Sequence, residues 1–165
     1  MRSDDQNDIP PKPAMPDVAA ARAIGPDAAV EARWQTVIPR WESTARTHGR
    51  GPGSECVDLV RLLRAAYAEP RLRRLYPWTS HYTLRFSRST TSPWTDEGNP
   101  FVEPMGGGVY RVHPPSGHDP LGSPAGPEAA VALVVEHLPP DLGPVVDRVE
   151  EKGDRAGAGQ GATGG

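Results

Sequence analysis

Residues 76–88 read YPWTSHYTLRFSR, and their second half carries the clearest strand pattern in the chain. Apolar and polar residues alternate over residues 82–86, which is typical of a strand with one buried face. Tyr82, Leu84 and Phe86 are then expected to point into the core, while the residues between them point away from it. The pattern predicts a sheet with one apolar face, on which the rest of the chain packs.

Two amphipathic helices are expected before this strand. Their apolar stripes are Val30, Trp34, Val37, Ile38 and Trp41 in the first helix, and Cys56, Leu59, Val60, Leu63 and Tyr67 in the second. Pro39 lies inside the first helix and is expected to kink it or split it. Trp34 and Trp41 lie on one helical face, so we expect both to pack against the sheet.

Two short strands and a helix are expected after it. Residues 100–105 and 109–113 read as strands, and three glycines at residues 106–108 supply a hairpin turn between them. Pro127 suits the first position of a final helix, which ends before Pro139-Pro140. The middle strand leaves the direction of Glu103 open, because burying its apolar neighbours Phe101 and Met105 would carry the carboxylate inward.

The expected order of elements is α-α-β-β-β-α with short connections. Neighbouring strands joined by short loops favour an antiparallel sheet. We therefore predict an α+β, two-layer fold with a small antiparallel sheet of three to four strands packed against about three helices. This single domain spans residues 27–149. Residues 1–26 form a Pro/Ala-rich arm, in which residues 18–24 could make a short helical turn, and residues 150–165 form a Gly/Ala-rich tail. Both are otherwise expected to be disordered.

Charge and composition argue against several classes of protein, namely nucleic-acid-binding, membrane-spanning and secreted proteins. The 165 residues have a net charge of −3, which argues against a nucleic-acid-binding protein, although residues 33–111 hold 12 arginines and 7 acids, a local excess of +5. No apolar run is long enough to cross a membrane, and the acidic, polar N-terminus has no signal-peptide core. Cys56 is the single cysteine, so a disulfide within the chain is excluded. A cytoplasmic protein is expected.

Three segments together resemble a known family. Residues 66–87, 106–112 and 128–140 are similar, in the same order, to a family of small actinobacterial proteins labelled "natural product biosynthesis protein", found chiefly in Streptomyces-like bacteria. The resemblance covers roughly residues 34–146. This family has no known function, so the resemblance implies a place in a biosynthetic locus and carries over no catalytic residues.

Several motifs have an ordinary structural interpretation. Cys56 lies on the apolar stripe of its helix, which favours a small core residue over a reactive thiolate. His113 and His118 match no strong metal-binding spacing, and we expect neither a metal nor a cofactor. The glycines at residues 106–108 lack the lysine and the helix that follow them in a phosphate-binding loop, which favours a simple turn.

Two candidate sites remain. The first is the outer face of the sheet, where His81, Arg85, Glu103 and Arg111 are candidates for an anion-binding or acid–base site, alongside Tyr82 and His113. The second is an arginine run that would suit an anionic partner, made of Arg61, Arg64, Arg71, Arg73 and Arg74. A solvated face is the alternative interpretation of each site.

Two classes of function follow from these features. The first is a non-catalytic binding or accessory protein of a natural-product locus, which holds an anionic protein, a peptide or a small molecule, with an exposed sheet edge as one route to a partner. The second is a small enzyme that uses acid–base chemistry without a cofactor. The absence of a nucleophile motif and of a cofactor fingerprint favours the first.

Overall fold

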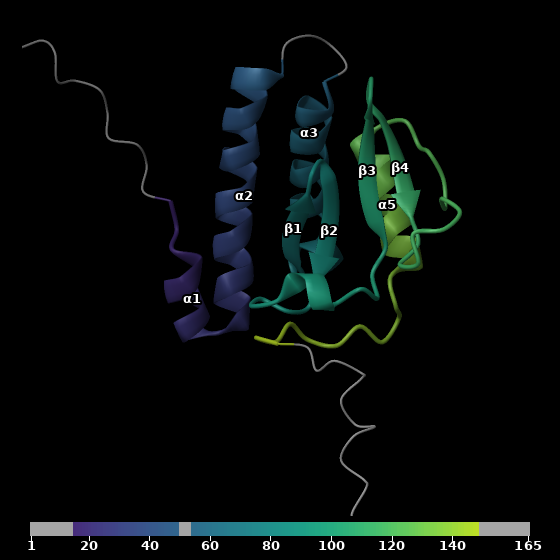
Figure 1. Cartoon of the computed structure of the whole chain (residues 1–165). Helices are drawn as coiled ribbons and strands as arrows, with labels where there is room; N and C mark the ends of the chain where they lie inside the picture. The colour runs from purple at the N-terminus through teal and green to yellow at the C-terminus, as the bar shows by residue number, and fades with distance from the viewer. Residues whose placement is uncertain (1–14, 50–53, 149–165) are drawn as a thin grey trace, which may run out of the picture.

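The computed structural model describes residues 15–49 and 54–148 of the chain (Figure 1). Its helices are α1 (Val18–Ile24), α2 (Pro26–His48), α3 (Glu55–Ala68), α4 (Pro70–Arg73) and α5 (Pro127–His137), with a 3-10 turn η1 at Pro93–Thr95. Its strands are β1 (Tyr76–Ser80), β2 (Thr83–Ser87), β3 (Phe101–Gly106) and β4 (Val109–His113). The predicted tail at residues 150–165 lies outside the described residues.

The strands form one antiparallel sheet in the order β1-β2-β3-β4. Helices α3 and α5 cover one face of this sheet, and α2 packs beside α3 and along β1 (Figure 1). The other face, called the outer face below, is not covered by a helix (Figure 1). The predicted α+β fold with two layers and a small antiparallel sheet is thus confirmed.

The stretch at residues 76–88 is a hairpin and not the single strand that we predicted. Ser80 pairs with Thr83, so His81 and Tyr82 alone make the turn between β1 and β2. Tyr82 therefore leaves the predicted inner face and is 39 % exposed. His81 has a φ of 56°, in the left-handed region that glycine and asparagine usually occupy. The turn contains no Gly or Asn, so its sequence gave no hairpin signal.

The inner face otherwise follows the predicted alternation. Leu84, Phe86, Tyr110 and Val112 are all buried, together with Val102 of the middle strand. Because Val102 faces inward, Phe101, Glu103 and Met105 belong to the outer face. This settles the direction of Glu103, whose side chain is 42 % exposed.

The first tryptophan of α2 reaches the core as predicted. Trp34 is fully buried in the same cluster as Leu84 and Phe86, and its indole N–H donates to the carbonyl oxygens of Arg73 and Leu75 at 3.0 and 3.1 Å. Trp41 lies nearer the hairpin turn, where its ring packs against Tyr82 with the ring centres 5.7 Å apart. The long helix thus holds α4 and the first hairpin in place.

The structure decides two points about the N-terminal third. Helix α2 is continuous over 23 residues, so Pro39 does not split it. Within the arm predicted to be disordered, Val18–Ile24 forms α1, because the Asp17 carboxylate accepts hydrogen bonds from the Ala19 and Ala20 amides at 2.9 and 3.2 Å. Helix α1 packs on α2, while residues 1–14 lie outside the described residues.

The expected free sheet edge is also covered. Along β4, the amides of Tyr110 and Val112 donate to the carbonyl oxygens of Pro124 and Gly122 at 3.0 and 2.9 Å. At the β1 edge, Arg33 of α2 donates to the carbonyl oxygen of Pro77 at 3.0 Å. Because the β4 edge already has backbone partners, strand addition at β4 is a poor model for how this domain binds another molecule.

Candidate functional site

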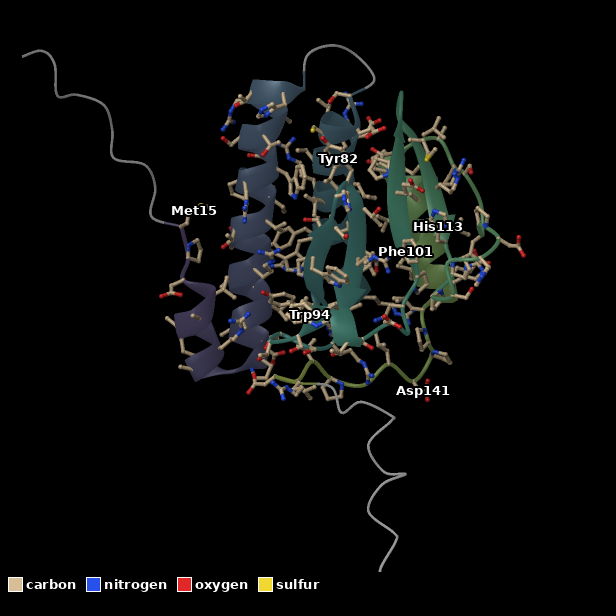
Figure 2. All side chains as sticks on the ribbon, viewed as in Figure 1. Met15, Tyr82, Trp94, Phe101, His113 and Asp141 are labelled. Carbon is tan, nitrogen blue, oxygen red and sulfur yellow. The ribbon has the colours of Figure 1, made fainter. Side chains whose placement is uncertain are left out.

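Four planar side chains follow one another across the outer face. They come from the four strands in turn and are Trp78, Arg85, Phe101 and His113, called the stacking row here. The register makes them neighbours, because Trp78 pairs with Arg85 and Phe101 pairs with His113 across their strands. Phe101 and His113 are labelled in Figure 2. The outer face therefore carries an ordered row of planar side chains and is not a simple solvated polar surface.

Arg85 occupies the centre of this row. The carbon of its guanidinium lies 3.8 Å from the centre of the Phe101 ring and 5.6 Å from that of Trp78, both within cation–π range. On the far side of Phe101, the His113 ring stacks at 4.8 Å with an angle of 17° between the planes. The position of the guanidinium is therefore fixed by stacking against rings.

The N–H donors of Arg85 have no hydrogen-bond or ion-pair partner among residues 15–49 and 54–148. Burial lowers the pKa of this guanidinium, and the negative charge of Glu97 offsets part of that effect. An arginine held by its flat faces, with its donors free, is well suited to bind a carboxylate or a phosphate through two parallel hydrogen bonds.

A cavity of about 250 Å³ lies directly beside Arg85. Its walls come from both strands of the first hairpin and from the loop after β2, and are Trp78, Ser80, Arg85, Phe86, Trp94, Asp96, Glu97 and Asn99. Trp94 is 60 % exposed on this loop and is labelled in Figure 2. The cavity thus joins a cation, two indole rings and two carboxylates, which suits a small polar molecule with a flat apolar part.

The second feature of the outer face is a carboxylate–imidazole pair. Glu103 Oε2 lies 3.0 Å from His113 Nε2, in adjacent strands, and the side chain of His113 is only 13 % exposed. The other ring nitrogen, Nδ1, is buried without a hydrogen-bond partner among the described residues. Such a pair is able to move a proton, although neither residue lines the cavity beside Arg85.

The predicted candidates of the outer face are only partly brought together. Arg85, Glu103 and His113 lie on or next to the stacking row, and Arg111 pairs across the strands with Glu103. His81 is exposed at the hairpin turn and does not line the cavity. Tyr82 lies in the same turn, where a hydrogen bond with the thiol of Cys56 raises the pKa of its phenol.

The arginine run is divided between two places. Arg61 and Arg64 of α3 lie near the carboxylates of Asp58 and Glu42. Arg71, Arg73 and Arg74 instead line a groove of about 850 Å³, called the α4 groove here, between the start of α2, α4 and residues 140–145. The groove also holds Asp27 and Glu31, and Glu31 pairs with Arg73 at 3.5 Å. Its excess of positive charge is therefore small.

Of the residues that line the cavity, sequence reasoning had proposed only Arg85 for a site, and it missed, among others, Trp78, Trp94, Glu97 and Asn99. Three of them lie in the connection between β2 and β3, which has no periodic pattern. The available signal was composition, because Trp94 is a large apolar residue in an otherwise polar loop. Among the described residues, no group of three or more His, Cys, Asp or Glu side chains is arranged to hold a metal ion.

No curated protein and no solved structure matches this chain. None of the helices in the described ranges is long and apolar enough to span a membrane. A family model described as a family of unknown function, DUF6193, matches residues 28–149, which include α2 through α5 and thus the whole outer face. The chain accordingly belongs to the DUF6193 family.

Proposed function

We propose that this protein is a non-catalytic binding protein that holds a small carboxylate-bearing molecule on the outer face of its sheet. The observation that carries the proposal is the state of Arg85, whose guanidinium is stacked against Trp78 and Phe101 while its N–H donors have no partner within the described ranges. Stacking fixes the orientation before binding, so little side-chain freedom remains to be lost.

The cavity beside Arg85 supports a small molecule over a protein or a peptide as the ligand. Its volume of about 250 Å³ falls just below the usual range for drug-sized ligands. The covered β4 edge of the sheet weighs against a peptide strand added there. The indole rings of Trp78 and Trp94 offer apolar contacts beside the cation, so an aromatic carboxylate is the best probe.

Titration with benzoate, followed by amide chemical shifts, tests this proposal. We expect shifts at residues that line the cavity, and we expect Arg85→Ala to abolish them. His81→Ala and Arg111→Ala are the matched controls, because neither residue lines the cavity, and both should bind benzoate as the unaltered protein does. Equal binding by Arg85→Ala, or loss of binding in Arg111→Ala alone, would overturn the assignment.

We place this binding protein, as part of the same proposal, in an actinobacterial natural-product biosynthetic locus as an accessory protein. Support comes from the three resembling segments and from the abundance of arginine over lysine, since only Lys12 and Lys152 are lysines. Deletion of the gene, with restoration by the intact gene and by Arg85→Ala, is the test. The pathway product should fall in the deletion strain and return only with the intact gene.

A second candidate function is acid–base catalysis without a cofactor on a pathway intermediate. It is favoured by the contact between Glu103 and His113, since a carboxylate 3.0 Å from an imidazole nitrogen can exchange a proton with it. His113→Gln separates the two functions. Loss of the pathway product while benzoate still binds would favour the enzyme, whereas an unchanged product would remove it from consideration.

A further inference from the structure

The cavity beside Arg85 contains two opposite charges that do not pair with each other. Arg85 and Glu97 both line it, yet no ion pair within 4.0 Å joins either of them to another described residue. Asp96, by contrast, is already engaged. Its Oδ2 accepts hydrogen bonds from the Arg88 amide at 2.7 Å and from Asn99 Nδ2 at 3.1 Å. The charge available to a ligand is therefore one cation and one carboxylate.

The same walls also carry two uncharged groups without a partner, one a hydrogen-bond donor and the other an acceptor. Trp78 Nε1 is a buried donor and Asn99 Oδ1 a buried acceptor, and neither has a hydrogen-bond partner within the described ranges. The orientation of the Asn99 amide is fixed, because its Nδ2 donates to the carbonyl oxygen of Phe86 and to Asp96 Oδ2, each at 3.1 Å. Asn99 is only 6 % exposed, and an unpaired acceptor at such a position calls for an explanation.

We infer that the ligand of this cavity is an α-amino acid, with its carboxylate on Arg85, its ammonium on Glu97 and an aromatic side chain against Trp78 and Trp94. This inference rests on the proposed function, which supplies the carboxylate, and adds the ammonium and the ring. A zwitterion is the smallest ligand that satisfies both free charges at once. The two unpaired polar groups match it in sign, with a donor for the carboxylate and an acceptor for the ammonium.

The ligand contacts Arg85 and Glu97 first, because Arg85 is half-buried and Glu97 is exposed. Trp78 Nε1 and Asn99 Oδ1 are enclosed by their neighbours, so a ligand reaches them only when nearby side chains move. Trp94 lies at the rim of the cavity, with its ring 60 % exposed on the loop that also carries Glu97. An exposed indole at the rim of a polar cavity also supplies the apolar wall that a ring-bearing amino acid needs.

Three related probes test the inference by calorimetric titration of the intact chain. They are phenylalanine, N-acetyl-phenylalanine, which lacks the ammonium, and phenylalaninamide, which lacks the carboxylate. Each missing charge-assisted contact is expected to weaken binding by about tenfold or more. In Glu97→Gln, phenylalanine and its N-acetyl form should bind with equal affinity. Glu136→Gln is the matched control, because it removes an exposed carboxylate on α5, away from the cavity.

The outcomes separate this inference from the proposed function. Equal affinity of the unaltered protein for phenylalanine and its N-acetyl form would overturn the zwitterion and leave carboxylate binding intact. Equal affinity for phenylalanine and phenylalaninamide would overturn the role of Arg85 and thus the proposed function as well. Alanine binding as tightly as phenylalanine would remove the aromatic side chain from the inference. Absence of heat with every carboxylate probe would overturn both proposals.

Discussion

Arg85 and Arg111 lie on the same sheet face, but their neighbours give them different chemistry. Arg85 lies between two aromatic rings, and burial lowers the pKa of its guanidinium. Arg111 lies across from Glu103, a carboxylate already in contact with His113. A sequence pattern that places both arginines on the polar side of a strand cannot separate them. The difference arises from which residues of the adjoining strands lie beside each side chain.

Tyr110 makes a pH-dependent contribution to stability. Burial raises the pKa of its phenol well above the ordinary value of 10.0, and its hydroxyl donates to the carbonyl oxygen of Asp58 at 2.8 Å. Below pH 10 the phenol is protonated in both the folded and the unfolded state. As the pH rises above 10, only the unfolded state loses the proton, so the free energy of unfolding falls.

We therefore expect Tyr110→Phe to cost about 1 kcal/mol at neutral pH, through the lost hydrogen bond. The same variant should lose stability less steeply above pH 10, because its side chain has no proton to release. Urea unfolding across neutral and alkaline pH measures both effects. An unchanged alkaline slope would show that Tyr110 does not control this behaviour.

Trp34 is expected to be the most costly tryptophan to remove. It is fully buried and donates two hydrogen bonds, so Trp34→Ala should lower the free energy of unfolding by about 3–5 kcal/mol. Trp94→Ala is the control, since a ring that is 60 % exposed should contribute within about 0.5 kcal/mol. A loss below about 1 kcal/mol for Trp34→Ala would mean that α2 does not pack on the sheet as described.

At the scale of elements, α2 tolerates a proline that was expected to disturb it. Pro39 is exposed and lacks the N–H that would bond to the carbonyl oxygen of Gln35 one turn earlier. The helix nevertheless continues, because it packs on α3 and β1 and Trp41, beyond the proline, bonds to Thr79 of β1. These tertiary contacts outweigh one missing backbone bond.

Pro39→Ala should accordingly stabilise the protein. Restoring the backbone bond and replacing proline by the best helix former is worth up to about 3 kcal/mol in an exposed helix interior. Thermal unfolding of the variant measures the gain, with Gln35→Ala as a control that keeps the proline. A lower melting temperature in Pro39→Ala would indicate that the proline ring fits this helix better than an ordinary residue.

A buried carboxylate of α3 holds the turn of the β3–β4 hairpin. Asp58 of α3 is 2 % exposed, and its Oδ2 accepts a hydrogen bond from the Gly108 amide at 2.9 Å. The glycines at residues 106–108 all have positive φ values of 85°, 66° and 77°, which few other residues adopt at low cost. The predicted hairpin turn is confirmed, and its contact with α3 explains why the turn stays fixed.

At the scale of the whole molecule, two separate hollows of the described residues contain arginines. One is the cavity beside Arg85 on the outer face, and the other is the α4 groove with Arg71, Arg73 and Arg74. Asp27 and Glu31 share the walls of the groove, so its excess of positive charge is small. The arginine run as a docking surface for an anionic partner stays a prediction.

We expect an acidic peptide that binds the α4 groove to do so in a salt-sensitive way. Exposed charges attract over a Debye length of about 10 Å at 0.1 M salt and about 3 Å at 1 M salt. Fluorescence anisotropy with a labelled glutamate-rich peptide measures the affinity at both concentrations. Arg74→Gln should weaken binding, whereas Arg61→Gln should not, because Arg61 lies outside the groove. Equal affinity at both salt concentrations would exclude this surface.

The sequence by itself determined the fold class, most of the helices and the inner face of the sheet. Those features depend on residues close together along the chain, such as the alternation from Thr83 to Ser87 and the helical spacing around Trp34. It also supplied Arg85 and His113 as candidates, because they fall on the polar side of their strands, and Glu103, whose direction it left open. It failed at residues 81–82, where a two-residue turn without glycine looks like part of a strand.

Only the tertiary structure decided which of these residues meet. The stacking row requires that Arg85 lie beside Phe101, and this follows from the pairing of Leu84 with Val102 between strands from different hairpins. Glu97 and Asn99 reach the cavity because their loop folds back over the first hairpin, where Asn99 bonds to Phe86. Register and loop path arise from contacts between distant segments, whereas periodicity records only the local environment of each residue.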